Sequence, residues 1–463
     1  MSNPASASIV PLTDRGRYLV LVCAFLGWLF AGVHMSITQL VGQPAAIDLL
    51  SRGGQLDVTR YRALGKQFPK LAGIRDAARS VTDDEKLLNQ WNALVARWFA
   101  WYQCAFLFGA ATGGLVFGRL GDRIGRAKAM GLSIITYSAM AGVAYFSQAP
   151  EHLLVCWFLA CTGVGGMWPN GVSLVSEAWS GMSRPLVAGV MGTSANIGIF
   201  LFSTLATKIK ITSDDWRWVM LAGAGPLVLG LFSLLLVPES PSWLAARLGS
   251  LSGQGTVSTH GEIFRPPLLK VTLLGILLAT IPIIGGWSTA NWMVPWAEDA
   301  GAAAIPPNPF LKAQVNQARA VTGVIGSLLG GWIAGCVGRR LTYAIVSAAC
   351  LFIAQYTFWF VVPTDPSFLF WVAGLGFFSG IYFGWLPLFL PELFPTRVRS
   401  TGSGVSFNFG RIVTALTVLT AGMLMTYVDG NYARIGRVTS LFFVLGIVAI
   451  GLAPDTSRKE LND

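Results

Sequence analysis

The sequence predicts an all-α membrane protein with twelve transmembrane helices arranged as two parallel six-helix halves. Three observations support this prediction. Of the 463 residues, 53% are hydrophobic and only 12% are charged, which is about half the charge of a typical soluble domain. Apolar runs long enough to cross a bilayer core of about 30 Å recur along the chain. Finally, several short motifs occur twice.

The apolar runs define the expected spans and the segments between them. The spans are expected near residues 18–41, 97–119, 127–147, 152–177, 184–207, 216–237, 267–297, 316–336, 341–362, 367–392, 399–427 and 434–453. They divide the chain into a tail at 1–17, a first half at 18–237 with a long loop at 42–96, a linker at 238–266, a second half at 267–453 and a tail at 454–463. Residues 82–85 (TDDE) match a capping box, so a helix is expected to begin there and to run toward the second span.

Positive charge in the short loops predicts the orientation in the membrane. Arg123, Arg126 and Lys128 follow the second span, and Arg339 and Arg340 follow the eighth. Because Lys and Arg mark the cytoplasmic side, both termini are expected in the cytoplasm. The protein itself is expected in the cytoplasmic (inner) membrane. The Arg-rich loop 42–96 disagrees with this orientation, but long loops cross the membrane largely regardless of charge.

Composition also bounds the function and the partners. The six cysteines all lie in apolar runs and show no metal-ligand spacing. No nucleophile–base pair or phosphate loop stands out, so neither an enzyme nor a cofactor is expected. The net charge of +11 lies mainly in short loops, where it reports topology, so nucleic acid is not an expected partner. The expected partners are a small-molecule substrate, the lipid bilayer and, as a coupling ion, protons; the chain is expected to be a monomer.

The repeated motifs indicate an internal duplication. Three motif pairs recur at offsets of 213, 215 and 216 residues: GRLGDRIGR at 118–126 with GWIAGCVGRR at 331–340, Glu177/Arg184/Gly189 with Glu392/Arg399/Gly404, and PES at 238–240 with PDT at 454–456. Nearly constant offsets predict two halves of six helices in the same orientation. Parallel six-helix repeats are the plan of one large class of secondary transporters.

These motifs resemble those of the major facilitator superfamily. The family pattern Gly-x-x-x-Asp-Arg-x-Gly-Arg is matched in full at 118–126, and PESPSWL at 238–244 and PELFPTRVRSTGSG at 391–404 are similar to loop signatures of sugar porters and organic-ion transporters. The resemblance covers essentially the whole chain and implies transport by rocking two halves around a central site. Two departures stand out: Gly335 and Cys336 replace the Asp and Arg of the second copy, and the first span lacks the acidic residue common in metabolite–proton symporters.

The charged loop residues are expected to form a gate latch on the cytoplasmic side. Asp122 would accept hydrogen bonds from Arg184 or a neighbouring arginine, and Glu177–Arg184 and Glu392–Arg399 would form pairs. A pair that forms in only one state biases the equilibrium between two states. The alternative is that these charges only anchor the helix ends at the membrane edge. The expected gating residues are Asp122, Arg123, Arg126, Glu177, Arg184, Glu239, Glu392 and Arg399.

Arg411 is the main candidate for substrate binding. It lies in the middle of the eleventh span, and no acidic residue lies at the centre of any span. An unpaired buried cation is costly, so Arg411 should face a wet cavity. A guanidinium group binds a carboxylate through two parallel hydrogen bonds, and a similar arginine occurs in organic-anion branches of the family that the chain resembles. The alternative is that Arg411 caps backbone carbonyls or stacks on Phe407 or Phe409.

Other mid-span residues complete the expected site. His34 in the first span titrates near neutral pH and is the candidate for carrying a coupling proton, with a packing role as the alternative. Aromatic walls with a few polar groups are typical of small-molecule sites, and the further expected residues are Trp168, Asn170, Asn196, Trp287, Asn291, Tyr382, Trp385 and Asn408. The breakers WPNG at 168–171 and PIIGG at 282–286 are expected to kink cavity-lining helices.

The predicted function is therefore secondary active transport of a small organic solute, an organic anion such as a carboxylate, across the cytoplasmic membrane by alternating access. Within transport, the alternative is a facilitator for a neutral sugar or polyol. From another class, the alternative is a membrane sensor that kept the fold without turnover.

Overall fold

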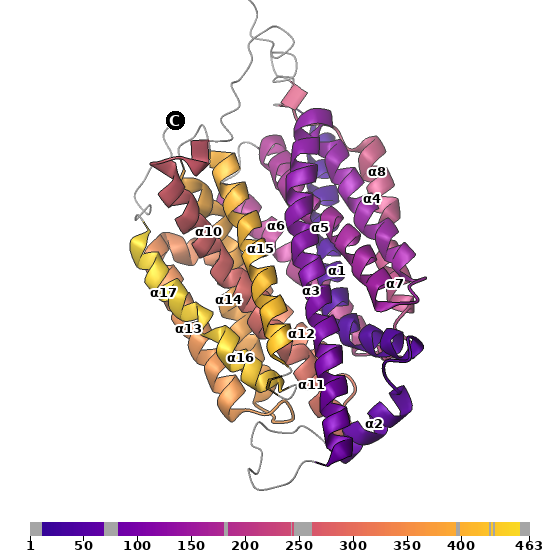
Figure 1. Ribbon diagram of the computed structural model, residues 1–463. Helices are drawn as coiled ribbons and strands as arrows, with labels where there is room; N and C mark the ends of the chain where they lie inside the picture. The colour runs from indigo at the N-terminus through magenta and orange to yellow at the C-terminus, as the bar shows by residue number, and fades with distance from the viewer. Residues whose placement is uncertain are drawn as a thin grey trace, which may run out of the picture.

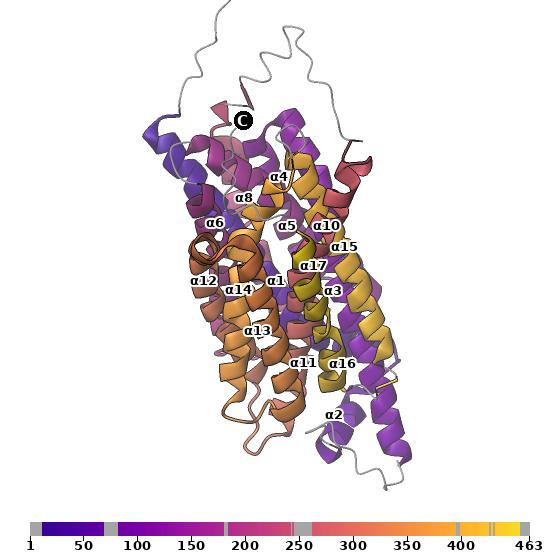
Figure 2. The same ribbon diagram turned by 90° about the vertical axis from the view of Figure 1, so that its left-hand side faces the viewer.

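The computed structural model describes residues 12–68, 82–179, 184–241, 243–244, 262–394, 399–425, 427–428 and 431–453. These residues form one bundle of helices that run side by side, with no strand among them. Figure 1 shows the first half of the chain on the right of the bundle and the second half on the left. One end of the bundle carries the short helix α2, and α1 begins at the opposite end (Figure 2); these are named the α2 end and the terminal end.

The first half contains α1 (Asp14–Arg52), α2 (Val58–Gln67), α3 (Asp83–Ile124), α4 (Arg126–Ala144), α5 (Pro150–Ala178), α6 (Arg184–Ala206), α7 (Trp218–Ala224) and α8 (Leu227–Leu236). The second half contains the 3-10 turn η1 (Glu262–Phe264), α10 (Leu268–Ile284), the π-helical turn η2 (Gly285–Thr289), the 3-10 turn η3 (Ala290–Trp292), α11 (Met293–Ala303), α12 (Leu311–Val337), α13 (Arg339–Phe360), α14 (Phe368–Glu392), α15 (Arg399–Leu424), α16 (Tyr432–Ser440) and α17 (Phe442–Leu452). Three predicted spans are interrupted helices: α7–α8, α10–α11 and α16–α17.

The twelve-helix architecture predicted from the sequence is confirmed. Within the described residues, eleven helical segments are long and apolar enough to cross a membrane. The twelfth is α4, which has 19 residues and packs against α3, α5 and α8. The breaker at 282–286 does interrupt its helix, because α10 gives way to the π-helical turn at Gly285. Pro169, by contrast, lies inside the uninterrupted α5.

The loop expected at 42–96 is shorter than predicted and partly helical. Helix α1 continues to Arg52, and α3 already begins at Asp83. The hydroxyl of Thr82 accepts a hydrogen bond from the backbone N–H of Glu85 at 3.3 Å, so the helix start predicted at this motif is confirmed. The short α2, which was not predicted, begins where Asp57 accepts hydrogen bonds from two backbone N–H groups. Both α1 and α3 continue as polar helix beyond their apolar runs. A prediction from apolar runs alone therefore placed the ends of these helices too early or too late.

Glycines hold equivalent helices in close contact in the two halves. A Cβ atom at Gly113 of α3 would lie 1.8 Å from the carbonyl oxygen of Thr162 on α5. In the second half, a Cβ atom at Gly326 of α12 would lie 2.1 Å from the carbonyl oxygen of Phe377 on α14. Small residues allow such close approach of membrane helices, where packing rather than water drives association. Gly113 and Gly326 also lie 213 residues apart, which matches the offset of the repeated motif.

Replacing Gly113 by Ala is expected to destabilise the bundle by about 3 kcal/mol or more, because the new carbon meets backbone atoms of α5 that cannot move aside. The measurement is the thermal unfolding of the purified protein in detergent. The matched control is Gly118→Ala on the same helix, where a Cβ atom meets nothing within 4 Å. Equal stability of the two variants would show that α3 and α5 do not pack as closely as described.

Candidate functional site

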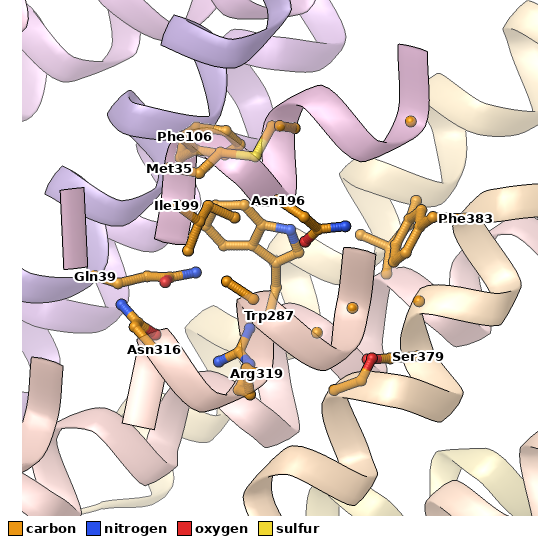
Figure 3. A pocket seen from close by; sticks show the side chains of 18 of the residues that line it. Met35, Gln39, Phe106, Asn196, Ile199, Trp287, Asn316, Arg319, Ser379 and Phe383 are labelled. Carbon is orange, nitrogen blue, oxygen red and sulfur yellow. The ribbon is translucent and has the colours of Figure 1, made fainter. Parts of the chain in front are cut away.

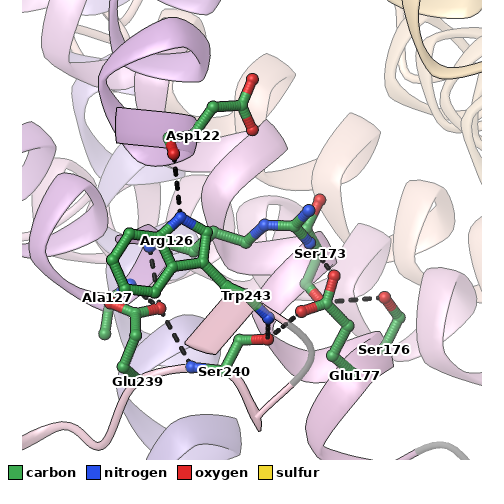
Figure 4. A network of polar contacts seen from close by, with 9 residues as sticks. All are labelled: Asp122, Arg126, Ala127, Ser173, Ser176, Glu177, Glu239, Ser240 and Trp243. Atoms are coloured by element: carbon green, nitrogen blue, oxygen red, sulfur yellow. Dashed lines mark hydrogen bonds and ion pairs between the residues drawn. The ribbon is translucent and has the colours of Figure 1, made fainter. Parts of the chain in front are cut away.

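The duplicated motif forms a network of polar contacts at the terminal end of the first half (Figure 4). The side chain of Arg126 forms an ion pair with Glu177, which also accepts a hydrogen bond from the hydroxyl of Ser240. Glu239 accepts hydrogen bonds from the backbone N–H groups of Arg126 and Ala127, at 2.8 and 3.2 Å. Glu239 therefore caps the first turn of α4, where a negative charge is stabilising.

The second half repeats both the turn and the ion pair. Gly125 and Gly338 have φ angles of 108° and 94°, a backbone conformation that glycine adopts without strain. One residue after Gly338, the guanidinium of Arg339 lies 3.2 Å from the carboxylate of Glu392 on α14. This contact repeats the first-half pair between α4 and α5. The duplication read from motif spacing is thus also a duplication of contacts.

The other predicted gating residues are placed differently. The side chains of Arg184 and Arg399, expected to pair with the two glutamates, lie outside the described residues. Asp122 and Arg123 are exposed. The backbone carbonyl of Asp122 accepts a hydrogen bond from the indole of Trp243 at 2.9 Å, and its carboxylate points away from the network in Figure 4. Their role in gating stays a prediction.

A cavity of about 180 Å³ lies between the two halves. Its walls come from α1, α3, α5 and α6 of the first half and from α10, η2, α12, α14 and α15 of the second. Six aromatic side chains contribute to these walls: Trp28, Phe106, Trp168, Trp287, Phe383 and Phe407. Such a concave, mostly apolar site with a few polar groups is typical for binding a small molecule.

Four of the predicted substrate-binding residues line this cavity, namely Trp168, Asn196, Trp287 and Arg411. Nη1 of Arg411 donates hydrogen bonds to the carbonyl oxygen of Ala110 and to Oδ1 of Asn408, both at 3.2 Å. Its guanidinium also lies 4.9 Å from the ring centre of Phe407. Arg411 therefore makes the packing contacts considered as its alternative role, and it still faces the cavity. Within the described residues it forms no ion pair.

Four of the other predicted residues, unlike Asn291 and Asn408, make contacts away from the cavity wall. Nε2 of His34 lies 3.0 Å from the carbonyl oxygen of Gly223, between α1 and α7. The amide of Asn170 donates hydrogen bonds to the carbonyls of Phe117 and Gly166, which ties α5 to α3. Tyr382 and Trp385 on α14 are fully buried, and each packs against Tyr343 on α13. These residues connect helices within one half.

Sequence reasoning missed Arg319, Gln39 and Asn316, which also line the cavity (Figure 3). The prediction began the eighth span at residue 316, so Arg319 counted as a charge at a helix end. Helix α12 in fact begins at Leu311. Arg319 thus lies more than two turns inside the helix, and a helix start placed five residues earlier would have revealed it.

Polar side chains bridge the two halves on the α2 side of the cavity. Oδ1 of Asn291 accepts hydrogen bonds from Nε2 of Gln39 at 3.1 Å and from Nη1 of Arg319 at 3.2 Å. The amide nitrogen of Asn291 donates to Gln103 of α3 at 3.2 Å. Nearer the α2 end, Nε2 of Gln43 donates to Asp299 at 3.0 Å. These contacts join α1 and α3 to the α10–α11 segment and close the cavity toward the α2 end.

A buried lysine adds a further link on the same side. Nζ of Lys312 on α12 donates hydrogen bonds to the carbonyl oxygen of Ile211, which precedes α7, at 3.0 Å and to Glu298 on α11 at 2.6 Å. Its side chain is only 5% exposed, so the carboxylate of Glu298 is needed to compensate its charge. Lys312 therefore links the second half to the loop between α6 and α7.

A model of the major facilitator superfamily matches residues 91–418 of the chain. The chain belongs to the major facilitator superfamily. This membership confirms the resemblance read from the motifs and makes the protein a multi-pass membrane transporter rather than an enzyme.

Known relatives of this superfamily member include bacterial transporters of organic solutes. It is 26% identical over 349 residues to the cis,cis-muconate transport protein of Acinetobacter baylyi, covering 74% of this chain and 82% of the relative. It is 26% identical over 384 residues to a gallate transporter of Pseudomonas putida, covering 75% of this chain and 80% of the relative. Among solved structures, the inward-open xylose transporter XylE from E. coli has the same fold, with a TM-score of 0.64 and 16% identity. The match covers 96% of this chain and 98% of XylE.

Replacing Glu177 by Gln is expected to lower the free energy of unfolding by about 1–2 kcal/mol, because the partly buried Arg126 loses its carboxylate partner. The measurement is thermal unfolding in detergent. Asp122→Asn is the matched control: this exposed carboxylate is expected to contribute within about 0.5 kcal/mol. A Glu177→Gln variant as stable as this control would show that the ion pair does not stabilise this conformation.

Proposed function

We propose that this transporter carries a small organic anion across the cytoplasmic membrane by alternating access, and that Arg411 binds the carboxylate of the substrate. One observation carries the proposal: a guanidinium that faces a central cavity and forms no ion pair among the described residues. A cation in the membrane interior is costly unless an anion or water compensates it. An anionic substrate supplies that compensation, and the planar guanidinium matches a carboxylate with two hydrogen bonds.

The relatives support the same class of substrate. One is described as a transporter of cis,cis-muconate and another as a transporter of gallate. Muconate carries two carboxylate groups and gallate carries one, in each case on a flat, conjugated body. The cavity offers aromatic walls to such a body and Arg411 to its charge.

The bridges between the halves support a mechanism of alternating access. In this conformation, hydrogen bonds from Gln39, Gln43 and Lys312 close the cavity toward the α2 end. In the orientation predicted from the loop charges, that end is extracytoplasmic, and the cavity would therefore exchange its substrate with the cytoplasm. The exposed carboxylate of Asp122 would then find its partner in the opposite state, when the terminal ends of the halves meet. Such state-specific contacts are what shift a two-state equilibrium.

Protons are the proposed coupling ion, and His34 is the proposed proton carrier. His34 is 5% exposed and contacts the carbonyl of Gly223, so its protonation would act on the packing of α1 against α7 rather than on the substrate directly. Uptake with and without a proton gradient separates coupled transport from facilitated diffusion.

Uptake into proteoliposomes tests the proposed substrate class. We expect labelled small carboxylates to enter and neutral sugars to remain outside, with accumulation when an inward proton gradient is applied. Arg411→Lys is expected to lower uptake at least about tenfold, because a lysine cannot form the two parallel hydrogen bonds. The control is Lys270→Arg, an exposed cation on α10. The proposal would be refuted if neutral sugars entered until their concentrations inside and outside were equal and the Arg411→Lys variant remained fully active. The protein would then be a facilitator.

The closure of the α2 end is testable with Gln43→Leu. Loss of the hydrogen bond to Asp299 is expected to favour the state that is open at the α2 end. The measurement uses spin labels at Lys208→Cys and Ser367→Cys, two exposed sites in different halves. The exposed Cys336 is replaced by Ser in this background so that it is not labelled. The distance between the two labels is expected to be longer with Gln43→Leu than without it. Gln355→Leu is the control, since Gln355 bonds only within the second half. An unchanged distance distribution for Gln43→Leu would refute the role of this bridge.

A further inference from the structure

We propose that the cavity binds a dicarboxylate, with Arg411 holding one carboxylate and a second polar subsite, made by Arg319, Asn316 and Gln39, holding the other. This inference rests on the proposed function and narrows its substrate class from organic anions to dianions. None of the three residues of the second subsite was expected from the sequence as part of the site.

The charge of the cavity wall is the first argument. Arg319 and Arg411 are the two charged residues among those that line the cavity, and no Asp or Glu lines it. Within the described residues, Arg319 donates only to a neutral acceptor, Oδ1 of Asn291, and forms no ion pair. Two uncompensated guanidinium groups in one cavity at membrane depth are costly. A ligand with two negative charges compensates both, whereas a monoanion leaves one unpaired.

Unsatisfied amides around Arg319 are the second argument. Asn316 lies three residues before Arg319 on α12, so both side chains lie on the same face of that helix. The side chain of Asn316 is buried, at 1% exposure, and neither its nitrogen nor its oxygen has a hydrogen-bond partner in the described structure. Oε1 of Gln39 also has none. Buried polar groups are nearly always hydrogen-bonded, and all three side chains converge on the same side of the cavity (Figure 3).

The chemistry of these groups favours a carboxylate at this subsite. Arg319 and the amide nitrogen of Asn316 are both donors, and a carboxylate is an acceptor with two oxygens. Gln39 donates one of its two amide hydrogens to Asn291. The other remains for the carboxylate, and its oxygen can accept a hydrogen bond from a hydroxyl or a water beside the carboxylate. A neutral sugar hydroxyl could satisfy the amides, but it would leave the charge of Arg319 uncompensated.

The separation of the two subsites sets the length of the ligand. Arg411 is anchored on the carbonyl of Ala110, which lies one turn from Phe106 on α3. Phe106 stacks on Trp287, with ring centres 4.2 Å apart, and Trp287 lies about one turn from Asn291, the anchor of Arg319. Both steps run toward the α2 end. Two turns place the anchors on the order of 11 Å apart along the bundle, so two carboxylates at opposite ends of one elongated body can reach both arginines.

The wall between the subsites suits a flat body. The indole ring of Trp287 lies between Phe106 and Arg319 in Figure 3, with one face stacked on Phe106. Aromatic and conjugated ligands pack well on such surfaces. This wall favours an elongated, planar dicarboxylate.

The test is uptake of two compounds that differ only in the second carboxylate: labelled hexa-2,4-dienedioate and hexa-2,4-dienoate. Both are measured in proteoliposomes at about pH 7, after subtraction of the leak into protein-free liposomes. The same pair is compared for benzene-1,4-dicarboxylate and benzoate. For the wild-type protein, we expect dicarboxylate uptake to exceed monocarboxylate uptake at least about tenfold, as expected when a hydrogen-bonded charge gains its partner.

The variants assign that preference to residues. Arg319→Gln is expected to lower the ratio of dicarboxylate to monocarboxylate uptake at least about tenfold; Asn316→Ala should lower it in the same direction, and Arg319→Lys should restore part of it. Arg97→Gln is the matched control, because Arg97 is exposed on α3 and its substitution should leave the ratio unchanged. Thermal unfolding of each variant confirms that it is folded.

Three results would overturn the inference. Equal uptake of both members of each pair by the wild-type protein would leave the proposed organic-anion function standing and refute the second subsite. A ratio unaffected by Arg319→Gln in a folded variant would refute the role of Arg319. Absence of uptake of every carboxylate would refute the proposed function itself, and the dicarboxylate inference with it.

Discussion

The cost of burying a charge in the hydrocarbon core governs this protein more than any other constraint. It restricts charged side chains to two kinds of place. At the ends of the bundle they form ion pairs, as Arg126 does with Glu177 and Lys312 does with Glu298. In the interior, they face the one described cavity that lies between the halves, as Arg319 and Arg411 do. The first set shapes the helix ends, and the second leaves positive charge for a ligand to compensate.

The duplicated sequence produces duplicated contacts, but the two halves contribute unequally to the cavity. Both halves contain a glycine turn with positive φ, an ion pair after that turn and a close glycine contact between equivalent helices. The two cavity arginines, by contrast, both come from the second half, on α12 and α15. The first half supplies aromatic residues and the glutamine bridges of α1. A shared scaffold therefore encloses a cavity whose two described charged side chains both come from the second half.

The polar bridges between the halves contact the proposed second subsite directly. Asn291 accepts hydrogen bonds from Gln39 and from Arg319, so a residue of the closure toward the α2 end also holds a cavity arginine. A carboxylate that draws Arg319 into the cavity would compete with Asn291 for the guanidinium. In the proposed mechanism, binding and closure therefore share Arg319 as a donor, which would let a substrate shift the balance between two states.

The sequence by itself determined the class of the protein, since apolar length, loop charge and repeated spacing are local properties that are readable along the chain. These properties predicted twelve helices in two halves, the resemblance of the loop motifs predicted the superfamily, and the cost of an unpaired buried charge predicted that Arg411 faces a cavity. They did not identify Arg319, because a charge near a predicted helix end looks like an interfacial anchor until the true start of α12 is known. They also nominated His34, Asn170 and Tyr382, whose polarity at mid-span depth does not reveal which way each side chain points. Only the packing of helices from different halves decided which of these polar groups share a cavity, because that depends on helix rotation and on contacts between residues far apart in the chain.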